Sequence, residues 1–174
     1  DVSAEDLLHL LLIASDNAAA RALARVSPLG SQGFIARMNQ KAVEMGLAHT
    51  RYTDPSGLLS DNLSSAYDLA RLITAVSAVE RISSIMRKQR HTITVGRRQI
   101  NIHSTNQLVM GGDVDVQAGK TGFIRKADTI IWLVSPNSVR SHWCNWELGE
   151  VQRTGKRLIP VRFGAIAPEE LPEA

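Results

Sequence analysis

The most informative segment of this 174-residue chain is Gln117-Ala118-Gly119-Lys120-Thr121-Gly122-Phe123-Ile124. Small, polar and apolar residues alternate on either side of Lys-Thr-Gly, which predicts a β-strand over 117–124. Because Gly122 has no side chain, another backbone can approach this edge closely. Lys120 and Thr121 place an ammonium and a hydroxyl group beside that edge, where they suit the terminal carboxylate of an extended peptide. The plainer alternative is an ordinary strand with one solvated lysine.

The composition is that of an ordinary globular protein, with 44% hydrophobic and 21% charged residues and a net charge of +3. The basic residues are scattered, which argues against nucleic-acid binding. Cys144 is the single cysteine, so an internal disulfide framework is excluded, and the five histidines lack metal-ligand spacing. We therefore expect no metal site and no cofactor. Since no apolar run approaches 18 residues, we also expect no transmembrane segment.

Apolar residues recur at helical spacing through the first part of the chain and predict five helices. These begin at Ser3, after Asn17, at Ser31, at Ser65 and ahead of Ile82. The first ends at Ser15-Asp16-Asn17, the second runs to about Val26, and Gly46 caps the third. From His91 the period changes to two, which predicts a β-hairpin around Gly96. The predicted class is α+β, with a helical block followed by antiparallel strands.

After Lys126 the pattern changes, and all three tryptophans lie beyond Ala127. Thr129–Val134 is continuously apolar, as in a strand buried on both faces. A helix over 138–154 and a second apolar strand over 158–161 complete a βαβ unit, which predicts parallel strands. We expect 129–134 to lie antiparallel to 117–124 and parallel to 158–163, in one mixed sheet. Residues 1–126 and 127–174 thus form two parts of different character.

Two short motifs connect the first part to a known family. Ser15-Asp16-Asn17 lies upstream of Lys120-Thr121-Gly122, and this pair accompanies a Ser-x-x-Lys nucleophile in penicillin-binding proteins and class A β-lactamases. Further matches follow in order: 34–39, 45–47, Thr50, 54–58 and Asn106. Residues 1–126 therefore resemble the low-molecular-weight penicillin-binding proteins, the D-alanyl-D-alanine carboxypeptidases and endopeptidases of peptidase family S11. The resemblance implies an incomplete DD-peptidase, β-lactamase-like fold.

The same resemblance implies a serine-type hydrolase of peptidoglycan, with a stem peptide or a β-lactam as ligand and a periplasmic or extracellular location. The implied site comprises Ser15, Asn17, Lys120, Thr121, Gly122 and Phe123. Ser15 would pass a proton to the leaving D-alanine amine, and Asn17 would hydrogen-bond the substrate backbone. Lys120 and Thr121 would bind the terminal carboxylate, and the Phe123 N–H would supply half of the oxyanion hole. A helix cap and turn is the alternative role of Ser15 and Asn17.

The sequence contains no Ser-x-x-Lys motif. The residues three positions before its five lysines are Met38, Ile85, Gln117, Phe123 and Arg153. In the family this motif lies upstream of the Ser-Asp-Asn motif, and Ser15 is preceded here by only fourteen residues. If the chain is a fragment, the motif should appear upstream. We expect no turnover by these 174 residues alone, because a serine hydrolase requires its nucleophile.

Residues 127–174 resemble the C-terminal half of a TIR domain, which has a flavodoxin-type fold. The matching segments are Trp143-Cys144, Glu147-Leu148, 155–161 and 169–172. This resemblance implies an NAD hydrolase with Glu147 as its catalytic residue, or TIR–TIR self-association, in the cytoplasm. Because the earlier TIR strands are absent from the sequence, we favour a solvated helix carboxylate as the role of Glu147. The third alternative is an inactive chimera or truncated chain.

Overall fold

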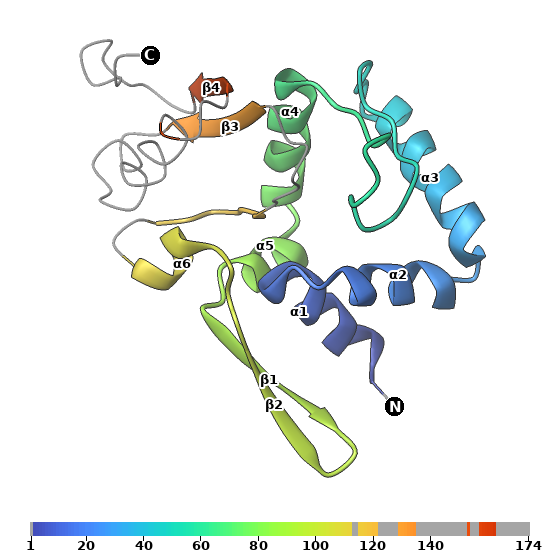
Figure 1. Cartoon of the computed structure of the whole chain (residues 1–174), viewed down its shortest axis with the longest axis vertical. Helices are drawn as coiled ribbons and strands as arrows, with labels where there is room; N and C mark the ends of the chain where they lie inside the picture. Colours follow the sequence, from blue (N-terminus) through green and yellow to red (C-terminus); the bar gives the residue numbers. More distant parts are fainter. Residues whose placement is uncertain (1, 113–114, 122–128, 135–152, 154–156, 163–174) are drawn as a thin grey trace. The chain divides into compact units, whose positions relative to one another are not determined.

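The computed structural model describes residues 2–112, 115–121, 129–134, 153 and 157–162 (Figure 1). The chain divides into two units, which are described separately. The first comprises residues 1–106 and 117–122, and the second comprises residues 107–116 and 123–174.

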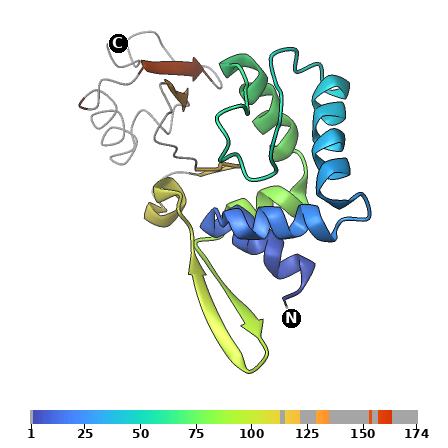
Figure 2. The same ribbon diagram turned by 45° about the vertical axis from the view of Figure 1, so that its right-hand side comes forward.

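The first unit contains five helices and a two-stranded antiparallel sheet among its described residues. These elements are α1 (Ala4–Ala14), α2 (Asn17–Val26), α3 (Gly30–Glu44), α4 (Ala66–Ser77), α5 (Glu80–Met86), β1 (Arg90–Val95) and β2 (Arg98–His103). The predicted helical block and hairpin are therefore confirmed. The hairpin turns at Gly96, whose φ of 61° suits a residue without a side chain. It extends away from the helices in both ribbon views (Figures 1 and 2).

Polar side chains cap the starts of α1 and α4. Ser3 caps α1 by accepting a hydrogen bond from the Asp6 N–H at 3.0 Å, and Ser65 caps α4 through the Asp68 N–H at 3.1 Å. Each cap satisfies one of the N–H groups that lack a partner inside the helix. At the other end of α3, Gly46 has a φ of 66°, the left-handed conformation in which glycine is favoured. These starts and stops agree with those predicted from the sequence.

The hydrophobic core of the first unit joins α1, α5 and the hairpin. Its centre consists of Ile13, Ile85, Ile93 and Ile102, of which Ile13 is only 1% exposed. Burying each of these side chains contributes roughly 1.5–3 kcal/mol to folding. Since Ile13 lies two residues before Ser15, the core fixes the end of α1 that carries this predicted site residue.

The loop between α3 and α4 is organised by the Asp54 carboxylate. Asp54 accepts hydrogen bonds from the N–H groups of Ser56, Gly57 and Leu59 at 2.5–2.8 Å, and from Asn62 Nδ2 at 2.6 Å. Burial opposes ionisation of this group, but the hydrogen bonds outweigh it and hold the pKa of Asp54 well below its ordinary value. The Asp54 carboxylate thus accepts the hydrogen bonds of loop N–H groups that would otherwise need a backbone partner.

The described residues of the second unit form a short helix and two parallel strands. These elements are α6 (Gln107–Gly111), β3 (Thr129–Val134) and β4 (Arg157–Arg162), with Ile130 opposite Leu158 in the ladder. The expected parallel pairing of 129–134 with the second apolar strand is confirmed. The sequence did not predict α6, which is only five residues long. The expected helix over 138–154, apart from the helical Arg153, lies outside the described residues.

The strand predicted over 117–124 is wrong for Gln117–Thr121, which adopt no strand. Carbonyl groups of this segment accept hydrogen bonds from side chains: Arg87 Nη1 donates to the Gln117 carbonyl at 3.3 Å, and Lys120 Nζ donates to the Thr121 carbonyl at 2.7 Å. A β-strand requires backbone hydrogen bonds to a neighbouring strand in their place. The predicted antiparallel pairing with 129–134 is therefore also wrong for 117–121, and it stays a prediction only for residues 122–124, which lie outside the described residues.

Candidate functional site

Ser15 occupies an unusual backbone conformation between two helices. It ends α1 with φ 58° and ψ 36°, the left-handed region, and it is the only described residue other than glycine with positive φ. The Asp16 N–H donates to the Leu10 carbonyl at 3.1 Å, closing a helix-ending turn, and the Asp16 carboxylate caps α2 through the Ala19 N–H at 2.8 Å. Both helices therefore hold Ser15 in a conformation that costs a side-chain-bearing residue roughly 1–2 kcal/mol.

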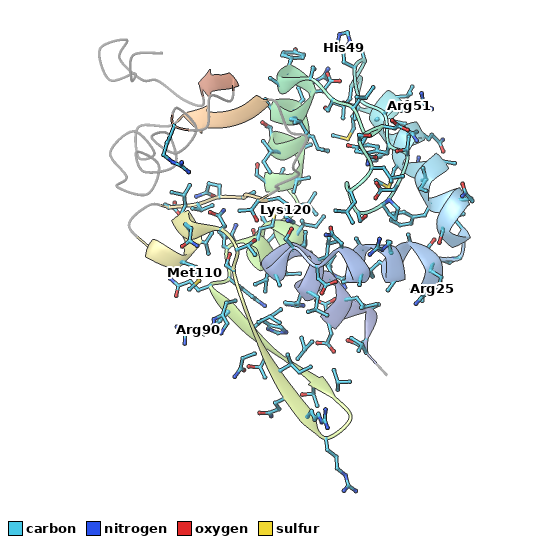
Figure 3. All side chains as sticks on the ribbon, viewed as in Figure 1. Arg25, His49, Arg51, Arg90, Met110 and Lys120 are labelled. Carbon is cyan, nitrogen blue, oxygen red and sulfur yellow. The ribbon has the colours of Figure 1, made fainter. Side chains whose placement is uncertain are left out.

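Lys120 connects the two predicted motifs across more than a hundred residues of sequence. Its Nζ donates a hydrogen bond to Ser15 Oγ and a second one to the Thr121 carbonyl, and its side chain is labelled in Figure 3. The residue as a whole is exposed, but partial desolvation of its ammonium group lowers the pKa of Lys120. A lysine with a lowered pKa, bonded to a hydroxyl, can exchange protons with that hydroxyl more easily than a fully solvated lysine.

Thr105 forms a further connection between the Lys-Thr-Gly motif and the end of α1. The hydroxyl groups of Thr105 and Thr121 are hydrogen-bonded to each other. Thr105 follows β2, and its N–H donates to the Ile13 carbonyl at 3.0 Å. The sequence alone assigned Thr105 no role, because a threonine in a polar loop has no distinctive pattern.

The structure brings together three of the predicted site residues, Ser15, Lys120 and Thr121. Asn17 is the first residue of α2 and is half-buried, and in the described part of the chain no hydrogen bond holds its side chain. Gly122, Phe123 and Glu147 lie outside the described residues, so their predicted roles stay predictions. Among the residues that are described, no cluster of three or more histidine, cysteine or carboxylate side chains could hold a metal ion.

This arrangement suits anion binding and proton relay. The Lys120 ammonium contacts the Ser15 hydroxyl, and the next residue, Thr121, carries a second hydroxyl; each of these three groups can donate a hydrogen bond to a carboxylate. The Ser15 hydroxyl can donate its proton to a bound group while it receives another proton from the Lys120 Nζ. Such a relay is what a departing amine requires in acyl transfer.

The model of the D-alanyl-D-alanine carboxypeptidase family, peptidase S11, matches residues 1–137. This chain belongs to that family. The D-alanyl-D-alanine endopeptidase of Haemophilus influenzae is 36% identical over 129 residues, covering 72% of this chain and 43% of the relative. The D-alanyl-D-alanine carboxypeptidase DacF of Bacillus subtilis is 26% identical over 172 residues, covering 98% of this chain and 40% of the relative.

Solved structures of the same family share the fold. The D-alanyl-D-alanine carboxypeptidase of Mycobacterium tuberculosis is matched with a TM-score of 0.65 and 29% identity, over 71% of this chain and 47% of that one. Penicillin-binding protein D2 of Listeria monocytogenes, solved in its ampicillin-bound form, is matched with a TM-score of 0.62 and 28% identity, over 72% and 51%. The chain spans about two fifths of the length of the curated relatives that it matches.

The predicted resemblance to the penicillin-binding proteins, and the DD-peptidase-like fold with it, is therefore confirmed. These comparisons do not show the TIR resemblance of residues 127–174. The family match runs to residue 137, past the boundary expected at residue 126 and through β3. The division of the chain into 1–126 and 127–174 stays a prediction. Among the described helices, none has the length and apolar character needed to cross a membrane.

Proposed function

We propose that this chain carries the substrate-recognition part of a serine-type D-Ala-D-Ala peptidase that acts on peptidoglycan stem peptides in the cell envelope. The observation that carries the proposal is the hydrogen bond from Lys120 to Ser15, which unites the Lys-Thr-Gly and Ser-Asp-Asn motifs in one site. Membership of the D-alanyl-D-alanine carboxypeptidase family supports the same substrate class.

In this proposal each side chain has a distinct task. The Lys120 ammonium and the Thr121 hydroxyl bind the terminal carboxylate of D-Ala-D-Ala, and Asn17 hydrogen-bonds the backbone of the stem peptide. When the peptide C–N bond breaks, the departing amine takes the Ser15 hydroxyl proton, and Lys120 replaces that proton from its Nζ. A β-lactam also carries a carboxylate and would occupy the same position. Cleavage additionally requires a nucleophile, and these 174 residues contain no Ser-x-x-Lys motif to supply it.

Binding can be tested without turnover by calorimetry. The ligands are two short acetylated peptides that differ only in ending with D-Ala-D-Ala or L-Ala-L-Ala. We expect the D,D peptide to bind more tightly, and Lys120→Met to weaken its binding roughly tenfold or more, because a charge-assisted hydrogen bond is lost. Lys41→Met is the matched control, since Lys41 lies exposed on α3 beside Glu44 and should leave the affinity unchanged. Equal affinity for the two peptides, or for Lys120→Met and the original chain, would contradict the proposal.

Residues 127–174 support a second hypothesis, that of a TIR-type NAD hydrolase or self-association module. The observation in its favour is the parallel pairing of β3 with β4, which the βαβ pattern predicted. Hydrolysis of NAD that is lost in Glu147→Gln would support this hypothesis. If the chain neither hydrolyses NAD nor binds the D,D peptide, the remaining alternative is an inactive chimeric or truncated chain.

A further inference from the structure

Thr105 contacts both the end of α1 that carries Ser15 and the segment that carries Lys120 and Thr121. Its N–H is bonded to the Ile13 carbonyl at 3.0 Å, two residues before Ser15, and its hydroxyl is bonded to that of Thr121. Ile13 is 1% exposed in the core between α1, α5 and the hairpin. The main chain of Thr105 is thus anchored to a rigid part of the molecule, while its side chain reaches the segment that carries Lys120.

These contacts close a ring around the site. The ring runs from Thr105 to Ile13, along the end of α1 to Ser15, through Lys120 to Thr121, and back to Thr105. Lys120 is a long and otherwise flexible side chain, labelled in Figure 3. Fixing Thr121, the next residue, restricts where the Lys120 backbone can lie and so favours contact of its ammonium with Ser15. Arg87 also holds this segment, but it does so at Gln117, three residues away from Lys120.

We propose that Thr105 is a positioning residue that holds Lys120 against Ser15 and orients the Thr121 hydroxyl for the substrate carboxylate. A hydroxyl group has one donor and two acceptor sites. When Thr105 donates its proton to Thr121 Oγ1, the Thr121 proton is left free to donate to a carboxylate oxygen. The substrate part of this inference rests on the proposed function, but the positioning of Lys120 does not.

Three variants separate this role from simple packing. Thr105→Val keeps the shape of the side chain and removes the hydroxyl, whereas Thr105→Ser keeps the hydroxyl and removes the methyl group. Thr121→Val removes the partner of the same hydrogen bond. Because Thr105 is exposed and Thr121 is only partly buried, all three chains should unfold at similar denaturant concentrations.

The first readout is the pKa of the Lys120 side chain, measured by NMR on ¹³Cε-labelled lysine and assigned with Lys120→Arg. In Thr105→Val we expect this pKa to rise toward the ordinary 10.5, because a released ammonium group is better solvated. Thr105→Ser should keep the lowered value. Adding Thr105→Val to Thr121→Val should cause no further rise, since the same hydrogen bond is already absent.

The second readout is the affinity for the acetylated D-Ala-D-Ala peptide, which Thr105→Val should weaken roughly 2- to 12-fold while Thr105→Ser preserves it. An unchanged Lys120 pKa in Thr105→Val would overturn the inference, even if the original chain binds the peptide. If the pKa rises as expected but no chain binds the peptide, Thr105 positions Lys120 and the proposed function fails. Weakened peptide binding together with a raised Lys120 pKa in Thr105→Val supports both the positioning role of Thr105 and the proposed function.

Discussion

Replacing Ser15 separately by alanine and by glycine should distinguish its hydroxyl group from its backbone conformation. Alanine removes the hydrogen bond from Lys120 and still has to adopt φ 58°, so it should destabilise the chain by roughly 0.5–1.5 kcal/mol. Glycine loses the same bond but avoids the roughly 1–2 kcal/mol cost of the left-handed conformation. Glycine also gives the unfolded chain more conformational freedom, and this offsets roughly 0.5–1 kcal/mol of the stability gained by avoiding that cost.

The glycine variant should therefore be more stable than the alanine variant by about 0.5–1 kcal/mol. Urea unfolding followed by circular dichroism measures this difference, provided that the two variants have equal m-values. Both variants should bind the D-Ala-D-Ala peptide more weakly than the original chain, since neither has a hydroxyl group. An alanine variant as stable as the glycine variant would refute the strained conformation of Ser15 and the placement of Ser15 that depends on it.

Three further predictions concern the loop, the histidines and the nucleophile. Asp54→Asn should cost about 2–3 kcal/mol because several donors lose their acceptor, whereas the exposed Asp61→Asn should change stability by less than about 0.5 kcal/mol in the same urea assay. Burial, together with the neighbouring His9 and Lys88, lowers the pKa of His91 in the folded chain. Because the unfolded chain then binds a proton more readily, the free energy of unfolding should decline as the pH falls below 6.5. His91→Phe should flatten that decline. Penicillin should form no stable adduct with these 174 residues by intact-mass spectrometry, and one adduct per chain would reveal a different nucleophile.

Local signals predicted most of the helical fold. Ser3 and Ser65 were predicted to start helices, and each caps one in the structure. The α2 cap was expected at Ser15 or Asn17, but the neighbouring Asp16 supplies it. The change from helical to alternating period at His91 similarly marks the hairpin. These features depend on residues within a few positions of one another, so a single sequence is enough to reveal them.

Features that depend on distant partners were less predictable. Gln117–Thr121 have the alternation of a strand, yet their carbonyl groups accept hydrogen bonds from Arg87 and Lys120 side chains. The stack of His9 on His91, with ring centroids 3.8 Å apart, had no sequence signal either. In both cases, tertiary contacts decide the outcome over local pattern.

The candidate site was predictable only through its motifs. Ser15, Lys120 and Thr121 were identified as members of two family motifs, and the structure brings these three residues together. Thr105 belongs to no recognised motif, and its contact with Thr121 appears only when β2 and α1 have been packed against each other.

The most direct test of this account is a titration of the ¹⁵N-labelled chain with the acetylated D-Ala-D-Ala peptide, followed residue by residue by NMR. We predict saturable shifts of the amide signals of Ser15, Asp16, Asn17 and Thr121, where the two motifs meet. The L-Ala-L-Ala peptide should cause much smaller shifts of the same signals. If the D,D peptide shifts signals elsewhere in the chain, or if both peptides shift these signals equally, the site formed by Ser15 and Lys120 does not recognise D-Ala-D-Ala.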